Sequence, residues 1–266
     1  MKIIAECGAT KTDWCAIYSD GTLKRLRTEG INFSVMTGQN ADEITRKAVM
    51  ALNEPGEMVS DMYIYAAGLI CERKGGNVEY ASDLLGAARA VCGHNPGIAA
   101  ILGTGSNSCF FDGEKIVSNV HSGGFILGDE GGAACLGKIF LSDFLKGMVP
   151  ASMAESFASS FESDYASIVQ KVYKSDAPSK YLGSIAPWVL DWYGKEEYAC
   201  NLVENNLRSF FERSLSQYDM ASCPVGLVGG FAVACKGILM KLSDEYGIRI
   251  SSIVESPMDG LIEYHR

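Results

Sequence analysis

The sequence predicts an α/β protein of two related lobes, each a mixed β-sheet flanked by helices. The first observation is an internal repeat. An apolar strand, a Gly/Thr turn and an alternating strand that ends in Asp-Gly begin at residue 2 and again at residue 98. The second is that Asp-Gly between alternating runs is a strong β-hairpin signal. The third is length, because 266 residues can form one or two domains with a large buried core.

The first lobe reads as three strands, a helix, a strand and a second helix. The repeat supplies the first two strands, and residues 22–26 supply the third. Helices are predicted at 41–52 and 81–92, and the continuous apolar run 62–67 is typical of a buried strand. Between residues 68 and 83 there is little room for a crossover helix and a returning strand. Either the sheet edge is trimmed or residues are missing there.

The second lobe begins with the second copy of the repeat, whose third strand is 115–118. A helix rich in small residues follows at 129–147, opening on acidic residues that suit its positive end. The later elements are predicted as helices 151–161, 165–172, 182–193 and 195–217, a strand from 224, helix 232–246 and strand 247–253. We therefore expect an N-terminal lobe at 1–95 and a C-terminal lobe at 96–266, with a helical insertion at about 150–220.

Composition narrows the class of protein. A net charge of −9 argues against a nucleic-acid surface. No apolar run reaches the roughly 18–20 residues of a membrane helix, and the start is too short for a signal peptide. Nine cysteines without a C-x-x-C pair fit free thiols in a reducing cytoplasm. An anionic ligand would thus be held by backbone amides, helix ends and a metal ion.

Two Gly/Thr turns are the first candidate sites. The first contains Gly8, Ala9, Thr10 and Lys11, and the second contains Gly103, Thr104 and Gly105. Either turn alone is most often a simple hairpin. As a pair, their backbone N–H groups and hydroxyls suit the phosphates of one nucleotide, gripped from two sides. Glu6, at the end of the first strand, would then lie near a nucleotide-bound Mg²⁺ and contact it through water.

Two further glycine-rich segments stand out. Residues 123–132 hold five glycines around Asp129 and Glu130. Helix capping by Asp129 explains one carboxylate but not the glycines on both sides. Gly229 and Gly230 join a strand to a helix, where a base or phosphate can approach the backbone, although an ordinary loop explains them equally well. Asp83, at the start of a helix, is explained in isolation as a cap.

Taken in this order, the segments resemble the BadF/BadG/BcrA/BcrD-type ATPases of the actin/hexokinase/Hsp70 superfamily, and within them the N-acetylglucosamine kinase branch. The resemblance covers essentially the whole chain and is carried by residues 6–14, 82–90, 101–109, 123–132 and 228–231. It implies two ribonuclease-H-like lobes with a central cleft for ATP, Mg²⁺ and an amino sugar, and extra helices in the C-terminal lobe.

The resemblance also implies roles for individual residues. Asp83 becomes the catalytic base that accepts the proton of the sugar 6-hydroxyl, which replaces its reading as a cap. The implied sugar-binding residues are Asn32, Asp83, Ser106, Asn107, Ser122, Gly123, Gly124 and Asp129. The implied nucleotide-binding residues are Gly8, Ala9, Thr10, Lys11, Gly103, Thr104, Gly105, Gly229 and Gly230. The chain departs from the family pattern at Cys7 and Ala9, at Ser122–Gly124 and at Gly132, where serine is common.

The predicted function is ATP-dependent 6-phosphorylation of an N-acetylated hexosamine, most of all N-acetylglucosamine. The expected partners are small molecules, with no nucleic acid and no membrane, and a homodimer is one state that the resemblance allows. The main alternative is an activator ATPase of a 2-hydroxyacyl-CoA dehydratase or benzoyl-CoA reductase system with a bridging [4Fe–4S] cluster. The spacing of Cys92 and Cys135 is compatible with it, but neither has cluster-like surroundings. A non-catalytic sugar sensor is a third alternative, and Asp83 and Asp129 speak against it.

Overall fold

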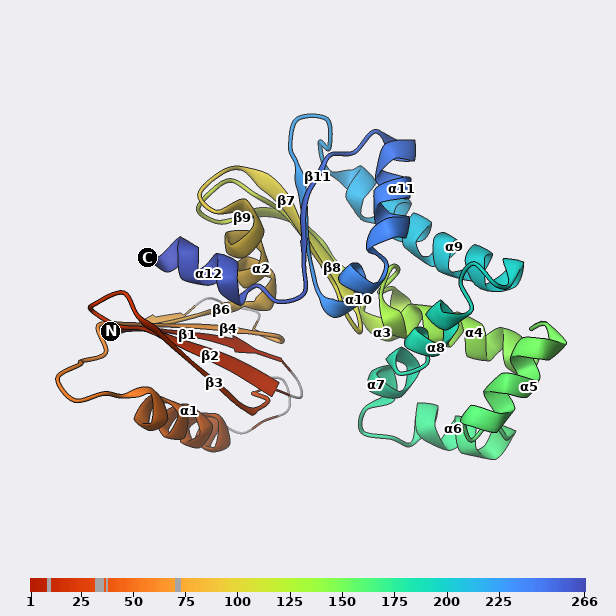
Figure 1. Cartoon of the computed structure of the whole chain (residues 1–266), viewed down its shortest axis with the longest axis horizontal. Helices are drawn as coiled ribbons and strands as arrows, with labels where there is room; N and C mark the ends of the chain where they lie inside the picture. Colours follow the sequence, from red (N-terminus) through yellow and green to blue (C-terminus); the bar gives the residue numbers. More distant parts are fainter. Residues whose placement is uncertain (9–10, 32–35, 37, 70–72) are drawn as a thin grey trace. The chain divides into compact units, whose positions relative to one another are not determined.

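The computed structural model describes residues 1–8, 11–31, 36, 38–69 and 73–266. The chain divides into two compact units (Figure 1). The N-terminal unit consists of Met1–Ala99, Cys109–Ser118 and Ser256–Arg266. The C-terminal unit consists of Ala100–Ser108 and Asn119–Glu255.

The N-terminal unit contains a six-stranded mixed sheet in the order β3-β2-β1-β4-β6-β5. Its strands are β1 (Lys2–Cys7), β2 (Lys11–Ile17), β3 (Leu23–Glu29), β4 (Asp61–Ala66), β5 (Arg73–Gly75) and β6 (Val78–Ser82). The predicted antiparallel repeat forms β1, β2 and β3, and β4 and β6 run parallel to β1. Of the two explanations for the short segment between residues 68 and 83, the structure shows a shortened sheet edge. In its described part β5 pairs with β6 as a short antiparallel strand, and no helix intervenes.

Helices cover both faces of this sheet (Figure 1). Helix α1 (Gly38–Leu52) buries Ala41, Ile44, Ala48 and Leu52, a helical spacing, against alternate residues of β1 such as Ile3. Helix α2 (Asp83–Cys92) packs on β4 and β6, and α12 (Met258–His265) packs on α2, β1 and β2. The last residues of the chain therefore belong to the N-terminal unit.

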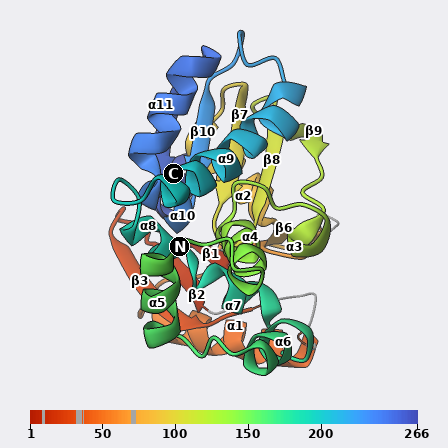
Figure 2. The same ribbon diagram turned by 90° about the vertical axis from the view of Figure 1, so that its right-hand side faces the viewer.

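The C-terminal unit contains most of a five-stranded sheet in the order β11-β10-β7-β8-β9, of which residues 97–99, 109–111 and 116–118 belong to the N-terminal unit. Its strands are β7 (Gly97–Leu102), β8 (Ser106–Phe111), β9 (Ile116–Val120), β10 (Val225–Val228) and β11 (Ile250–Val254). Figure 2 shows β10, β7, β8 and β9 side by side. The second copy of the repeat thus forms β7, β8 and β9. Strand β10, between β7 and β11, is buried along its whole length, which explains its uninterrupted apolar sequence.

Helices make up the rest of this unit. They are α3 (Gly124–Leu127), α4 (Ala133–Leu145), α5 (Ala151–Ser160), α6 (Tyr165–Tyr173), α7 (Pro178–Gly183), α8 (Ala186–Asp191), α9 (Glu197–Arg213), the 3₁₀ turn Leu215–Gln217, α10 (Gly230–Ala234) and α11 (Lys236–Tyr246). The predicted helix 129–147 is wrong at its start. Helix α4 begins at Ala133 because Asp129 to Gly132 form a tight turn closed by a Gly132 N–H···O Asp129 bond of 2.9 Å. Among the described residues, no helix has both the length and the apolar character to cross a membrane.

Candidate active site

Three parallel strands of the N-terminal unit end in register. Cys7 lies beside Ala66, and Ala66 lies beside Ser82. The residues that follow these strands therefore gather at one edge of the sheet, the edge where ligands bind in α/β proteins. Among them are Gly8, in the first predicted phosphate turn, and Asp83, the predicted base.

The carboxylate of Asp83 is not the cap of helix α2. Ser82 is the N-cap, since its Oγ accepts a hydrogen bond of 3.1 Å from the N–H of Leu85. Asp83 is the first helical residue, and its Oδ1 accepts the adjacent N–H of Leu84, at 2.9 Å. Burial raises the pKa of the Asp83 carboxyl above its usual value, although backbone hydrogen bonds from Leu84 and from Asp83 itself oppose the shift. A carboxylate with a raised pKa is a stronger proton acceptor, which suits a general base.

Glu6 lies on β1 in the same electrostatic neighbourhood. Burial raises the pKa of Glu6, and the nearby carboxylates of Asp13 and Asp83 raise it further. Lys11 and Arg27 act in the opposite direction, and each forms an ion pair with Asp13, at 3.6 and 2.6 Å. A carboxylate in such surroundings is stabilised in its charged form by an added cation.

Glu6 is the residue predicted to lie near the Mg²⁺ that the resemblance implies. In the described part of the chain, no three or more His, Cys, Asp and Glu side chains are grouped so that they could hold a metal ion. Glu6 therefore does not belong to a complete set of protein ligands for a metal ion in the described part of the chain. Because Mg²⁺ on a nucleotide keeps several waters and is bound by phosphate oxygens, one carboxylate acting through water is sufficient. The residues present fit the indirect role predicted for Glu6.

The first phosphate turn is only partly described. The N–H of Gly8 donates to the carbonyl of Lys11 at 2.9 Å, which closes the turn, and the Lys11 side chain is exposed. Three predicted residues lie outside the described residues: Ala9, Thr10 and Asn32.

The second phosphate turn is fixed to the start of helix α4. The N–H of Gly103 donates to the carbonyl of Gly105 at 2.9 Å, and the first helical N–H groups, of Ala133 and Ala134, donate to the carbonyls of Gly103 and Thr104 at 2.9 and 2.8 Å. The positive end of the helix dipole thus lies against the turn, where an anion is favoured. Thr104 itself is exposed and can offer its hydroxyl to a ligand.

The predicted nucleoside loop lies beside this turn. Gly229 follows β10 with φ at +129°, and its N–H donates to the carbonyl of Val254 at 2.8 Å. A Cβ at this position would lie 2.3 Å from the carbonyl oxygen of Leu102, the residue that precedes Gly103. Gly230 begins helix α10 and is exposed. The structure therefore brings the two predicted nucleotide segments of this unit together.

Three of the predicted sugar-binding residues also meet. The buried Asp129 carboxylate accepts hydrogen bonds from the N–H of Ser106, at 3.4 Å, and from the Ser122 side chain. The N–H of Asp129 in turn donates to the Ser122 carbonyl at 2.9 Å. Burial raises the pKa of Asp129 despite these bonds. Asp129 is also the one described residue other than glycine with positive φ, at +59°, and strain of this kind concentrates at functional sites.

The remaining predicted sugar-binding residues of this unit are Gly123, Gly124 and Asn107, which are close in the chain to Ser122 and Ser106. Gly123 and Gly124 are exposed and have φ of +74° and +70°, and Gly124 begins α3. The Oδ1 of Asn107 accepts the N–H of Ser108 and the Nδ2 of Asn119, both at 2.9 Å. Asn107 is thereby held in one orientation.

Sequence reasoning missed the side chains that support these loops. The hydroxyl of Tyr218 donates to the carbonyl of Ser108 at 2.9 Å and accepts the N–H of Val120 at 2.8 Å. Asn206, on α9, bonds to the turn after Asp129. Its signal in the sequence was a polar residue on the apolar face of an amphipathic helix, which is unfavourable unless the side chain has partners.

The two sheets, the glycine turns at their strand ends and the carboxylates beside them define the two-lobe fold of actin-like ATPases. A solved structure of a candidate N-acetylglucosamine kinase from Porphyromonas gingivalis is 34% identical to this chain. It aligns with 100% of this chain and 98% of its own, at a TM-score of 0.90. The chain therefore belongs to the BadF/BadG-type ATPase family, in its N-acetylglucosamine kinase-like branch.

More distant structures agree on the fold. A candidate N-acetylglucosamine kinase from Chromobacterium violaceum is 17% identical at a TM-score of 0.79, covering 100% of this chain and 98% of the other. A ROK family glucokinase from Streptomyces griseus, in complex with glucose and AMPPNP, is 15% identical at a TM-score of 0.55, covering 99% and 97%. No protein-family model and no curated protein matches the chain.

Proposed function

We propose that this protein transfers the γ-phosphoryl group of ATP to the 6-hydroxyl of an N-acetylated hexosamine, with N-acetylglucosamine as its foremost substrate. The two candidate N-acetylglucosamine kinases support this class of substrate. The glucokinase in complex with AMPPNP supports a nucleoside triphosphate as donor.

The observation that carries the proposal is the state of Asp83. Its carboxylate stands at the end of a parallel strand, where Ser82 takes over the capping of α2. Burial raises its pKa, so it is a competent proton acceptor that the fold does not need as a cap. Its backbone hydrogen bonds lower the pKa, but burial outweighs them.

In the proposed reaction, the carboxylate of Asp83 accepts the proton of the 6-hydroxyl while that oxygen attacks the γ-phosphorus. The bond from phosphorus to the bridging oxygen breaks, ADP leaves, and the proton remains on Asp83 until solvent removes it. Mg²⁺, when bound, supplies positive charge to the phosphate oxygens. The exposed Thr104 hydroxyl, at the end of the α4 dipole, stabilises the same charge.

The sugar would be selected by the polar residues around Asp129 and by Asn107. Asp129 accepts from two groups in the unit and has further lone pairs for a sugar hydroxyl. Asn107 keeps its amide N–H groups for the acetamido carbonyl, because its oxygen is taken by Ser108 and Asn119. Such fixed polar groups discriminate strongly against a sugar that lacks the matching group.

A coupled ADP-release assay tests the proposal with N-acetylglucosamine, N-acetylmuramic acid, glucosamine, N-acetylmannosamine and glucose. N-acetylglucosamine should give the highest kcat/KM, and ³¹P NMR should show a 6-phosphate. Asp83→Asn should lower kcat by about 10²–10⁴-fold. Asp112→Asn is the control, since Asp112 binds only the N–H groups of its own turn. Wild-type turnover by Asp83→Asn would refute the assignment of the base.

The activator ATPase with a bridging [4Fe–4S] cluster is the rival. Its cluster would need accessible thiolates, and Cys135 is buried with its pKa raised by burial. Protein purified without oxygen should therefore be colourless and contain no iron. A brown sample with stoichiometric iron and sulfide would favour the rival.

We also propose a cytoplasmic setting and small-molecule partners only. All eight cysteines in the described residues are free thiols, as a reducing compartment requires. The homodimer is retained as a proposal, and light scattering with size-exclusion chromatography tests it.

A further inference from the structure

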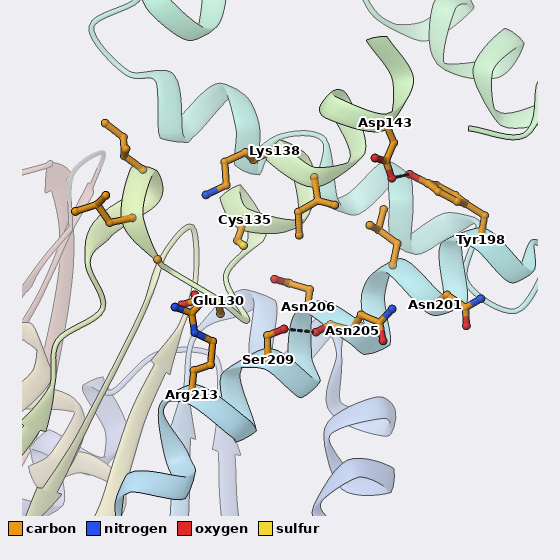
Figure 3. A pocket seen from close by; sticks show the side chains of 15 residues that line it. Glu130, Cys135, Lys138, Asp143, Tyr198, Asn201, Asn205, Asn206, Ser209 and Arg213 are labelled. Carbon is orange, nitrogen blue, oxygen red and sulfur yellow. Dashed lines mark hydrogen bonds and ion pairs between the residues drawn. The ribbon is translucent and has the colours of Figure 1, made fainter. Parts of the chain in front are cut away.

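One face of helix α9 contacts the turn that follows Asp129. Asn206, Phe210 and Arg213 are spaced four and three residues apart, so their side chains project from the same side of the helix. The face borders a cavity of about 530 Å³ that α3 and α4 also line. Figure 3 shows Asn206 and Arg213 on α9, with Arg213 beside Glu130.

Asn206 uses both ends of its amide on this turn. Its Oδ1 accepts the N–H of Gly131 at 3.1 Å, and its Nδ2 donates to the carbonyl of Gly132 at 3.2 Å. The side chain is only 2% exposed. A buried amide is costly unless it is fully paired, so these two bonds must form together and fix the turn relative to α9.

Two more contacts act on neighbouring residues of the turn. Gly131 has φ at +79°, and a Cβ there would lie 2.6 Å from the Cβ of Phe210. Its backbone thus lies directly on the helix. Arg213 forms an ion pair with Glu130. Helix α9 therefore contacts each of the three residues after Asp129.

Asp129 needs this support because its backbone is strained. A positive φ at a residue other than glycine costs about 1–3 kcal/mol and persists only where the surroundings impose it. The Asp129 carbonyl accepts the N–H of Gly132, whose own carbonyl is held by Asn206. The bonds of Asn206 thus act on the second and third residues after the strained Asp129.

We infer that Asn206 is a positioning residue, which holds the turn so that Asp129 presents its carboxylate to the amino sugar. The inference rests on the proposed function, since it assumes that Asp129 binds the sugar. It gives the helical insertion a role in sugar affinity through α9.

The test compares Asn206→Leu with Asn205→Leu. Asn205 is the adjacent residue of α9, is exposed and lines the same cavity, so it is a matched control. Calorimetry with N-acetylglucosamine should give a Kd raised about tenfold or more in Asn206→Leu, because two buried hydrogen bonds are lost. The Kd for ATP should stay within about twofold. Hydrogen exchange should accelerate at residues 122–132 in Asn206→Leu only.

A purely structural role is excluded by Leu207→Ala. Leu207 is fully buried on α9, but its aliphatic side chain cannot form hydrogen bonds to the turn, so this variant should lower Tm but leave the sugar Kd unchanged. Should Asn206→Leu fail to fold, Arg213→Ala replaces it. Arg213 is 65% exposed, and its loss should raise the sugar Kd about two- to fivefold.

Separate outcomes address the inference and the proposed function. The inference alone would be overturned if Asn206→Leu bound the sugar as tightly as wild type. It would also be overturned if Asn206→Leu and Leu207→Ala each lost sugar affinity and ATP affinity to the same extent. Wild-type protein that neither binds nor phosphorylates an amino sugar would overturn the proposed function, and with it the role given to Asp129.

Discussion

The α-carbon of Gly229 lies so close to the carbonyl oxygen of Leu102 that a Cβ there would stand 2.3 Å from it. Strands β10 and β7 are neighbours in the sheet, and both end at this point. The close approach places the predicted nucleoside loop against the second phosphate turn, which begins at Gly103. Only glycine permits it, because φ at Gly229 is also +129°.

Gly229→Ala should therefore destabilise the protein and weaken ATP binding. The added methyl group must displace backbone, so a loss of about 2–4 kcal/mol in the free energy of unfolding is expected. Urea denaturation measures the loss, and calorimetry measures the Kd for ATP. Gly230→Ala is the matched control, since a Cβ at Gly230 meets nothing within 4 Å. Equal stability of the two variants would contradict the close approach.

Asp83→Asn should gain stability at neutral pH while it loses activity. Because burial raises the folded-state pKa of Asp83, the unfolded chain releases this proton first as the pH rises. Wild-type protein thus loses stability as the pH rises from the unfolded-state pKa to the folded-state pKa of Asp83. The variant removes this loss, so its unfolding free energy should exceed that of wild type by about 0.5–2 kcal/mol at pH 7.

The gain should shrink as the pH falls through the unfolded-state pKa of about 3.9, below which Asp83 becomes protonated in both states, and Tm measured from pH 3 to 8 follows it. Asp164→Asn serves as the comparison of opposite sign. The pKa of Asp164 is lowered by hydrogen bonds from Ser167 at the cap of α6, so its ionised form stabilises the fold. A Tm of Asp83→Asn below that of wild type at pH 7 would contradict the raised pKa.

Local patterns in the sequence predicted the repeated three-strand units and their glycine turns well. Period-two alternation and Asp-Gly turns depend on neighbours in the chain, so they can be read directly. The start of α4 could not be read in this way. Acidic residues favour a helix start at Asp129, but the turn there depends on contacts from Asn206 and Phe210, which lie about eighty residues further along.

The position of the C-terminal helix α12 could not be predicted from the sequence either. Nothing in residues 258–265 indicates that α12 packs on the first strands, because that contact joins the two ends of the sequence. The N-cap of α2 is Ser82, one residue before Asp83, the cap that the sequence suggests in isolation. Helix boundaries predicted from sequence commonly differ by one or two residues. The residues of the candidate site were named from the family resemblance, whereas their supporting side chains required the structure.

His265, the last residue of α12, should make the stability of the protein depend on pH. Burial lowers the pKa of His265 to about 3, with Arg89, Lys2 and His94 adding to the effect and Asp61 opposing it. The Nε2 of His265 shares a hydrogen bond of 2.7 Å with the Tyr65 hydroxyl. The imidazole ring stacks on the ring of Tyr63, with 3.6 Å between the ring centroids. As the pH falls below about 6.5, the unfolded chain binds a proton that the folded state rejects. Stability contributed by neutral His265 is thus present above this pH and lost below it.

His265→Gln should be less stable than wild type at pH 7.5, by about 1–2 kcal/mol, because it loses the ring stacking. The difference should shrink steadily between pH 6.5 and 4, since only wild type has the histidine to titrate. Chemical denaturation at several pH values measures both free energies, and carboxylates that titrate in the same range cancel in the difference. A gap that stays constant with pH would show that the pKa of His265 is the same in the folded and the unfolded state.

The last prediction concerns the carboxylate of Asp129. A Cβ at Gly105 would lie 2.6 Å from Oδ2 of Asp129, whose other contacts, to Ser106 and Ser122, hold it in a buried position. Gly105→Ala must therefore push the carboxylate away, at a cost of about 1–3 kcal/mol in stability. The same displacement should raise the Kd for the amino sugar about tenfold or more.

Gly103→Ala, two residues earlier in the same turn, is the matched control. A Cβ there meets nothing within 4 Å, and its φ is not positive, so stability and sugar affinity should remain close to wild type. Any loss in Gly103→Ala should fall on ATP, because the turn is predicted to hold phosphate. Urea denaturation and separate titrations with sugar and ATP distinguish the two variants. If Gly105→Ala bound sugar as tightly as Gly103→Ala does, the Asp129 carboxylate would not be the group that the sugar requires.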